Sequence, residues 1–579
     1  SSDGRPAQLR HPRPADAAGR SPAEPCLPRL PMTQHTEGEL DIKSVPSKPA
    51  VRDDGLYRTG KFCGGIKEDI RRRLPWYVSD WVDGFRGGVK TITAALYMFF
   101  GCLAPGIAFG AFFDQSSGGK SGVIEYLITQ AVSGIIFALI SGQPLVILRP
   151  TGPITVFITN LWRITNPMGL SYLAVQAWTG IFVGIYMIII AVTDSCAAIR
   201  HCSRFTQDLF GFFVSTIFIS MGIGNIVEKF TTKADQYNAP VQLLITAGML
   251  YCALQMANFN KAKFFNSKTR ETVADFAVAA AVIVFTAIAN FVTVPIEPLP
   301  VPDAFGPTEK GRSWVVDLAC GQCVAIGAVA AIPLLLLFFI DQNVTMLLTQ
   351  QPAHKLKKGG AFHYNFFILG VFNICFPIFG CPYVTGSLPH SPQFVNALAR
   401  KEIKRENGVE TSEIVEVYEN RLAPLLVNVL VLISLPIIEK LRYIPTAVIC
   451  DALFLFMGLS GLPGNQLYER LKLMITEESL YPPLPWTKEE VPRMRMHLFT
   501  LIQLAVVAVL FGVTQNASVA VSFPVFLVSS IPLRMCLHRI TGGYITKEMV
   551  QILDFNRPES SDDAPPEKAA VPLDGTEAL

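Results

Sequence analysis

The sequence predicts an all-α polytopic membrane protein with fourteen transmembrane segments, arranged as two inverted seven-segment repeats. Half of its 579 residues are hydrophobic and only 16% are charged, and the mean hydropathy is +0.37. Such a balance is typical of chains whose apolar runs lie in lipid. Two proline- and glycine-rich interruptions, 142–153 and 379–392, fall at corresponding places in the two halves. Paired broken segments indicate a transporter built from inverted repeats, whereas kinked spans without a ligand are the plainer alternative.

Composition excludes several other classes of function. A net charge of +3 is too small to indicate nucleic-acid binding. The sequence has no Walker motif that would indicate ATP-driven transport and no nucleophile–base constellation that would indicate an enzyme. No metal or cofactor is expected. Cys320 and Cys323 have the spacing of a redox or metal motif, but they open a hydrophobic span without a second pair, so we expect them to pack between helices.

The two ends of the chain are predicted to be disordered. Residues 1–60 are rich in Pro, Arg, Ser and Asp and show no periodicity, so we expect a disordered cytoplasmic N-terminus. Residues 546–579 form an acidic, proline-containing tail, also expected to be disordered and cytoplasmic. The transmembrane domain is then 61–545, with repeats at about 61–295 and 314–545.

The apolar runs set the spans in order. A basic cluster at 67–73 precedes an aromatic segment at 76–81, which indicates a cytoplasmic N-terminus and an amphipathic helix on the inner leaflet. The first seven spans are predicted at about 88–112, 121–141, 143–164 (broken), 170–193, 205–227, 238–258 and 271–295. The second seven are predicted at about 317–349, 361–380, 381–400 (broken), 423–439, 443–462, 496–515 and 517–537.

Loop charge supports this topology. The expected inner loops 194–204, 259–270, 350–360, 400–422 and 463–495 all carry Lys or Arg, whereas outer loops such as 113–120 and 165–170 are poor in both. Positive charge on inner loops is the rule for membrane proteins. The loop at 440–442 is an exception. We expect a multi-pass protein, in the plasma membrane, with both termini in the cytoplasm.

The broken segments predict an anion site. After an extended stretch at about 381–385, a short helix is expected from Ser387 to Arg400, and a second from Ile154 to Arg163 follows the other interruption. A helix that starts inside the membrane points its free N–H groups and positive dipole end into the interior, where they attract an anion.

Four charged or titratable residues lie in or beside these segments. Asp341 is deep in a span, where a carboxylate costs about 2.5–3.5 kcal/mol, so it is expected to face a cavity, coupling transport to H⁺ or Na⁺ or contacting substrate; a structural carboxylate is the alternative. Arg149 either supplies fixed charge to the site or snorkels to the inner surface. His390 either titrates near neutral pH or packs. Asp208 either tunes the site or complements a helix dipole.

Several motifs resemble the bicarbonate/borate transporter family, which contains the band 3 anion exchangers and the plant and fungal boron exporters. They cover about residues 60–545 and are Gly64–Arg73, Gly142–Leu145, Arg204–Phe210, Asp341–Thr345, His354–Gly359 and Arg495–Thr500. The resemblance implies a gate domain, a mobile core domain and a homodimer. It also implies that substrate lies between Thr151-Gly152-Pro153 and Gly386-Ser387-Leu388, beside Asp341.

The chain departs from the exchangers of this family in two places. It has His390 where they have an arginine and Asp341 where they have a glutamate. The run Leu388-Pro389-His390-Ser391-Pro392 is more similar to the boron exporters. We therefore expect a secondary transporter of small inorganic anions that works by elevator-like alternating access, with borate favoured and bicarbonate as the alternative. A sulfate- or nucleobase-type permease of the same architecture is a second alternative.

Overall fold

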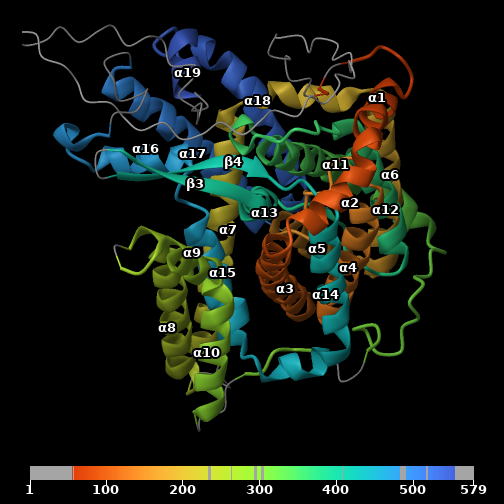
Figure 1. Ribbon diagram of the computed structural model, residues 1–579. Coiled ribbons are helices and arrows are strands. Elements are labelled where there is room, and N and C mark those ends of the chain that lie inside the picture. Colours follow the sequence, from red (N-terminus) through yellow and green to blue (C-terminus); the bar gives the residue numbers. More distant parts are fainter. Residues whose placement is uncertain are drawn as a thin grey trace, which may run out of the picture. The chain divides into compact units, whose positions relative to one another are not determined.

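The computed structural model is described here for residues 55–56, 58–232, 237–262, 264–292, 297–301, 305–406, 409–482, 491–516 and 519–554. The predicted disordered N-terminus lies almost wholly outside these residues, as does most of the predicted C-terminal tail. Helices dominate the described part, as Figure 1 shows, and the expected all-α membrane class is confirmed.

The spans of the first repeat follow the predicted order. They are α3 (Val89–Ser117), α4 (Val123–Ile140), the half-helix α5 (Gly152–Thr165), α6 (Tyr172–Val192), α7 (Arg204–Thr231), α8 (Ala239–Ala257) and the bent pair α9 (Ser267–Asp275) and α10 (Ala277–Phe291). The bend between the last two is 62°.

The second repeat has the same order. It contains α11 (Gly321–Thr349), α12 (Phe362–Ile378), the half-helix α13 (His390–Leu398), α14 (Leu422–Ser434) with the 3-10 helix Leu435–Tyr443, the π-helix Ala447–Ala452 with α15 (Leu453–Ser460), α17 (Arg493–Gln515), and the 3-10 helix Ala520–Ser522 with α18 (Phe523–Ile540). In the described residues nine helices are long and apolar enough to span a membrane, and the bent pair makes ten. Two shorter apolar helices, Phe362–Ile378 and Ala447–Ser460, and the two half-helices complete the fourteen expected segments.

The spans pack as two groups. The first four segments of each repeat meet: α6 packs extensively against both α11 and α12, and α14 packs against α3 and α4. The remaining segments form their own contacts, with α7 against α15, α17 and α18, and α8 against α10. The first group corresponds to the expected core domain, the core, and the second to the expected gate domain, the gate.

Short helices and a β-hairpin lie at one end of the spans. They are α1 (Gly64–Arg73), the 3-10 helix Leu74–Trp76, α2 (Tyr77–Arg86), α16 (Gln466–Met474), α19 (Lys547–Leu553) and a hairpin of β3 (Ala399–Glu406) and β4 (Val409–Val417). The remaining 3-10 helices are Ser195–His201, Phe259–Lys261, Pro352–His354 and Glu478–Leu480. The hairpin occupies what was expected to be an inner loop at 400–422. The segment predicted to be a disordered tail from residue 546 begins with α19, whose following residue Asp554 pairs with Arg534 at 2.7 Å.

Buried charges attach the first two helices to the core. Asp80 of α2 is fully buried and pairs with Arg73 at 3.3 Å, Lys358 at 2.8 Å and Arg421 at 3.1 Å. Arg421 also donates to the carbonyls of Ala138 and Ser141 at the end of α4. Because Arg73 belongs to α1 itself, the α1–α2 segment is held by two other parts of the chain, at Lys358 and Arg421, and Arg421 is in turn bonded to the end of α4.

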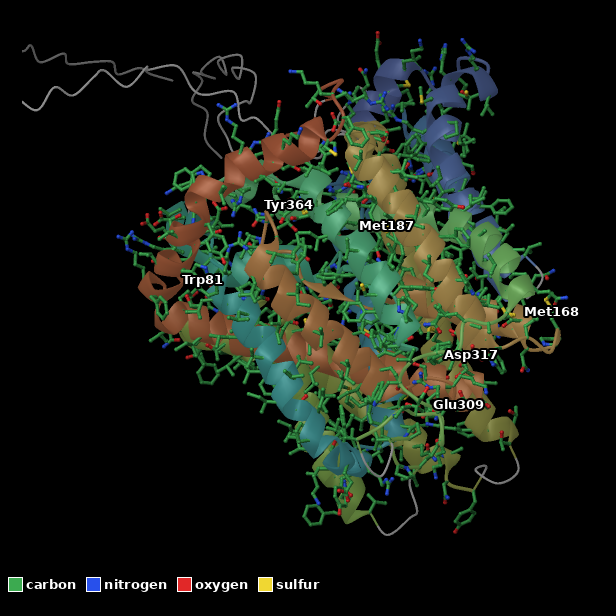
Figure 2. All side chains as sticks on the ribbon, turned by 90° about the vertical axis from the view of Figure 1, so that its right-hand side faces the viewer. Trp81, Met168, Met187, Glu309, Asp317 and Tyr364 are labelled. Atoms are coloured by element: carbon green, nitrogen blue, oxygen red, sulfur yellow. A yellow bond between two sulfur atoms is a disulfide. The ribbon has the colours of Figure 1, made fainter. Side chains whose placement is uncertain are left out.

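The connection between the repeats lies against the opposite end of the core. Glu125 of α4 is fully buried and accepts hydrogen bonds from the Thr308 amide at 2.8 Å and the Thr308 hydroxyl at 2.6 Å, and it pairs with Arg312 at 3.0 Å. Figure 2 labels Glu309 and Asp317 of this connection at one end of the core and Tyr364 of α12 toward the other.

The expectation for Cys320 and Cys323 was wrong. The two are joined by a disulfide at the start of α11. Cys320 is the N-cap and Cys323 lies in the first turn, so a three-residue spacing brings the two sulfur atoms onto one side of the helix end. Within the described residues no group of three or more His, Cys, Asp or Glu is placed to hold a metal.

Candidate anion site between the broken segments

The two broken segments pair with each other. β1 (Leu148–Arg149) lies antiparallel to β2 (Thr385–Gly386), with Leu148 opposite Gly386 and Arg149 opposite Thr385. The ribbon is extended by a bond from the Ser387 amide to the Ile147 carbonyl, at 2.8 Å. Membrane-buried backbone must find partners inside the protein, and each interruption supplies them to the other. Antiparallel pairing is also what an inverted repeat requires of two equivalent strands.

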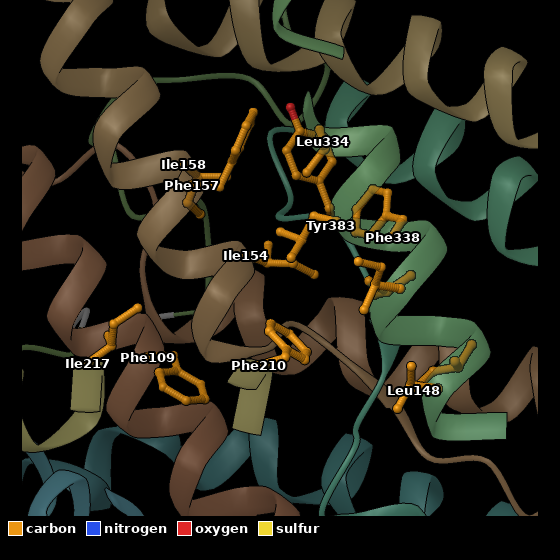
Figure 3. Close-up of a cluster of buried hydrophobic side chains, with 14 of the residues drawn as sticks. Phe109, Leu148, Ile154, Phe157, Ile158, Phe210, Ile217, Leu334, Phe338 and Tyr383 are labelled. Atoms are coloured by element: carbon orange, nitrogen blue, oxygen red, sulfur yellow. The ribbon is translucent and has the colours of Figure 1, made fainter. Parts of the chain in front are cut away.

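The half-helix α5 begins directly after β1. Thr151 has extended backbone and Gly152 opens the helix, and Thr151, Gly152 and Pro153 are all buried. The helix is held against the core by its apolar side: Figure 3 shows Ile154, Phe157 and Ile158 facing the side of α11 that carries Leu334 and Phe338, with Tyr383 between them. This packing fixes the N-terminus of α5 inside the protein.

The half-helix α13 is shorter than expected. It runs from His390 to Leu398, whereas Ser387 to Arg400 was predicted. Its start is displaced because the Ser387 amide is used by the ribbon and Pro389 caps the helix. Its end is displaced because residue 399 already belongs to β3. Gly386 and Ser387 therefore lie in the ribbon and the turn that leads into the helix, and Leu388 is half-buried in that turn.

One face of α11 contacts both interruptions. Asp341 is buried and accepts a hydrogen bond from the Thr151 hydroxyl at 3.3 Å. The Gly386 amide donates to Gln342 Oε1 at 2.7 Å, and the Thr345 hydroxyl donates to the Gly386 carbonyl at 3.1 Å. Asp341 itself thus contacts the first break, while its neighbours on α11, Gln342 and Thr345, contact the second.

Arg149 points into the protein. It is 3% exposed, so it does not snorkel to the surface. Its Nε donates to the Ser387 hydroxyl at 3.1 Å, and that hydroxyl lies 2.8 Å from His390 Nδ1. The guanidinium carbon is 5.7 Å from the centre of the Phe109 ring. Among the described residues Nη1 of Arg149 is buried without a hydrogen-bond partner, which leaves a charged donor free for an anion.

Comparison with known proteins decides the family. The model of the HCO3- transporter integral membrane domain matches residues 61–242 and 231–558, which is most of the described chain. The chain belongs to the HCO3- transporter family. It is 30% identical to the human band 3 anion transport protein over 86% of this chain and 56% of that protein. It is 29% identical to human anion exchange protein 3 over 86% of this chain and 44% of that protein.

The chain thus spans about half the length of these curated relatives. Among solved structures, the transmembrane domain of a cyanobacterium bicarbonate transporter, BicA, is 14% identical over 72% of this chain and 96% of that chain, with a TM-score of 0.47. The relatives are anion transport and exchange proteins, which are not enzymes, in agreement with the sequence analysis. The matches do not show a special closeness to the boron exporters.

In this HCO3- transporter family member Asp208 lies in a different setting. It pairs with Arg204 at 3.2 Å, its carboxylate accepts from the Gln466 amide at 3.4 Å, and its carbonyl accepts from the Asn465 side chain at 2.7 Å. Its bonds join α7 to the start of α16. The site residues that the structure brings together are those on β1, α5, α11 and the segment 385–390.

Two polar groups of the site were not singled out from the sequence. Thr345 lies one helical turn after Asp341, and the Ser391 hydroxyl, one turn after Ser387, accepts from the Ile147 amide at 3.0 Å. Both are buried hydroxyls, and Ser391 also adjoins Pro392. A four-residue spacing from the residues already chosen was the signal that could have identified them.

Proposed function

We propose that the chain is a secondary active transporter that exchanges a small, hydroxylated inorganic anion across a membrane. The observation that carries this proposal is the mixture of groups around the two breaks. Arg149 and the N-terminus of α5 offer donors and positive potential, while Asp341 offers an acceptor 3.3 Å from Thr151. A protonated oxyanion can both accept from the first group and donate to the second, whereas a halide can only accept.

Borate is the first candidate substrate and bicarbonate the second. The run Leu388–Pro392 supports borate through its similarity to the boron exporters, and a tetrahedral borate presents four hydroxyl groups to acceptors. The matched family model supports bicarbonate, because its description names HCO3-. Bicarbonate is planar and has one hydroxyl group, so the number of acceptors that the substrate uses separates the two.

Alternating access would move the core against the gate. The proposed substrate site lies within the core, on β1, α5 and α11, and the α7–α15 pair of the gate packs beside it. The proposal also includes coupling to H⁺ or Na⁺ through Asp341. It further includes a homodimer in the plasma membrane with both termini in the cytoplasm. These follow from the family resemblance and from the loop charges.

Flux in vesicles tests the function. Purified protein in sealed vesicles is given an inward gradient of boron, read by elemental analysis, or of bicarbonate, read by an internal pH dye. Protein-free vesicles give the background from neutral boric acid and CO2. Boron flux above background that is lost in Asp341→Asn supports borate, and bicarbonate flux alone supports the second candidate. If neither anion moves above background, the proposed function is wrong.

A further inference from the structure

A cavity lies between the core and the gate. Its volume is about 330 Å³, and it is lined by the second half of α3 and by α5 from Val156 onward, both of the core, and by α7 from Ile217 onward and the end of α17, both of the gate. Polar groups on its wall include Asn160 and Arg163 of α5 and Asn225 and Glu228 of α7. Asn160 is 2% exposed, and its Oδ1 is buried without a hydrogen-bond partner among the described residues. The wall is therefore suited to hydrated, polar contents.

Three phenylalanines, from the core and from the gate, pack against one another near the cavity. The Phe109 ring centre is 5.7 Å from that of Phe218 and 5.6 Å from that of Phe454, and the last two rings are stacked at 6.3 Å. Phe109 belongs to α3 of the core, whereas Phe218 and Phe454 belong to α7 and α15 of the gate. Figure 3 labels Phe109 and Ile217, a cavity-lining residue, within the same buried cluster.

The positions of the three rings along their helices show which side of them faces the cavity and which side faces the anion site. The cavity is lined by Phe112, Val156 and Met221, each about one helical turn beyond Phe109, Gly152 and Phe218 respectively. On the other side the rings reach the site itself. A Cβ built on Gly152 would lie 2.2 Å from Cε1 of Phe218, so the ring of Phe218 rests on the first residue of α5.

We propose that Phe109, Phe218 and Phe454 form an aromatic barrier between the cavity and the anion site, and that the cavity is the outer entrance for the anion. This deepens the proposed function and rests on it. A hydrated anion cannot cross a layer of packed rings without losing its water, which is costly in an apolar environment. One ring belongs to the core and two belong to the gate. Movement of the core relative to the gate therefore separates the rings. Gly152 is then required because only a residue without a Cβ lets Phe218 close over the helix end.

Thiol labelling tests the barrier without knowledge of the substrate. On a background that lacks the native cysteines, Val156→Cys lines the cavity and Thr151→Cys lies behind the barrier. With a membrane-impermeant methanethiosulfonate added outside, we expect Val156→Cys to react and Thr151→Cys not to react. Addition of Phe218→Ala should raise the labelling rate of Thr151→Cys by about tenfold or more, because the ring contacts are lost. Phe230→Ala, an exposed position on the same helix, is the matched control and should leave the rate unchanged.

Three results would overturn the inference: fast labelling of Thr151→Cys with Phe218 intact, no increase with Phe218→Ala, or labelling of Val156→Cys from the inside only. A second pair of variants keeps the test independent of folding defects. Gly152→Ala should open the barrier by pushing Phe218 away, and Gly152→Ala with Phe218→Leu should restore slow labelling of Thr151→Cys. If the labelling pattern is as expected but vesicles that contain the protein with Thr151 and Phe218 intact show no anion flux, the proposed function is refuted while the barrier stays in place.

Discussion

Asp341 combines two properties that separate a functional carboxylate from a structural one. It is buried, and among the described residues its side-chain hydrogen-bond partner is a single hydroxyl, that of Thr151 at 3.3 Å. A structural carboxylate in a membrane segment is normally paired with a cation or with several amides, because the cost of burying it is high. An acceptor that is only partly satisfied and lies next to two chain breaks is suited to a ligand that donates hydrogen bonds.

We expect Asp341→Asn to abolish transport or uncouple it from its driving cation without unfolding the protein. The amide is isosteric and keeps a bond to Thr151, but it cannot carry the negative charge. Flux and its cation dependence in vesicles check this, with Asp317→Asn, an exposed carboxylate of the connection between the repeats, as the control. Wild-type flux with wild-type cation dependence in Asp341→Asn would rule out a role for this charge.

Arg149 is expected to supply the standing positive charge of the site. Loss of a charged hydrogen-bond donor costs about 1.5–3 kcal/mol, so Arg149→Ala should weaken anion affinity by roughly 10- to 100-fold at every pH. Titration of the substrate against flux measures this. Normal affinity in Arg149→Ala would show that another group provides the charge.

His390→Gln, which keeps a polar partner near Ser387, should change only the pH response of binding.

The site residues that could be predicted are those whose type conflicts with the surrounding sequence. Asp341 is a charge in an apolar run, and Thr151 and Ser387 adjoin helix breakers, so each conflicts with its surroundings. Phe109 and Phe218 gave no such signal, because a phenylalanine is expected anywhere in a membrane helix. Only the three-dimensional contact of α3 with α7 and α15 shows what these rings separate.

At the scale of elements, hydrophobic runs located the spans and missed the short strands. The ribbon of Leu148–Arg149 with Thr385–Gly386 is two residues long on each side, too short to show any alternation. The segment 400–422, which contains most of the hairpin, was interpreted as a charged inner loop because of Lys401, Lys404 and Arg405. A short hairpin rich in charged residues is not distinguished from a loop by its composition alone.

The docking of α1 provides a pH test. Asp69 is buried against the amide of Tyr364 and the guanidinium of Arg72, each at 3.0 Å, and burial raises its pKa from 3.8 to about 7. Between those values the folded state binds more protons than the unfolded state, so stability falls as pH rises from about 4 to 7. Asp69→Asn should remove this slope from the melting temperature in detergent. Glu68→Gln, on the same helix, controls for loss of one negative charge. An unchanged slope in Asp69→Asn would assign the pH response to another group.

At the scale of the whole molecule, Asp80 holds together parts that are far apart in the sequence. Removal of one partner of a buried ion pair costs about 3–5 kcal/mol, because the remaining charges stay desolvated. We therefore expect Asp80→Asn to lower the melting temperature strongly. Asp83→Asn removes a carboxylate that also pairs with Lys358 at 2.8 Å but is 26% exposed, and it should cost only about 0–1 kcal/mol. Equal effects of the two variants would contradict a buried origin of the stabilisation.

The membrane orientation is the property on which the entrance and the barrier both depend. Loop charge predicts that Lys357 lies inside and Gly118 outside. In the structure Lys357 pairs with Glu416 of β4 at 2.7 Å, which places it with the short elements at one end of the spans. Gly118 ends α3 next to the connection between the repeats: Lys120, two residues on, pairs with Glu309. Met168, labelled in Figure 2, lies in the loop between α5 and α6, toward the same end as Glu309.

Single cysteines on a background without the twelve native ones test this orientation. Lys357→Cys should react with an impermeant thiol reagent only from the inside, and Gly118→Cys only from the outside. Gly118 has a φ of +64°, where a side chain is strained, so Met168→Cys serves as a second outer position. It is 56% exposed, and its substitution disturbs no such backbone. The reverse pattern at all three positions would invert the protein in the membrane and make the cavity beside Asn160 the inner entrance. A mixed pattern would contradict the order of spans itself, because 113–120 and 165–170 are predicted to share one side.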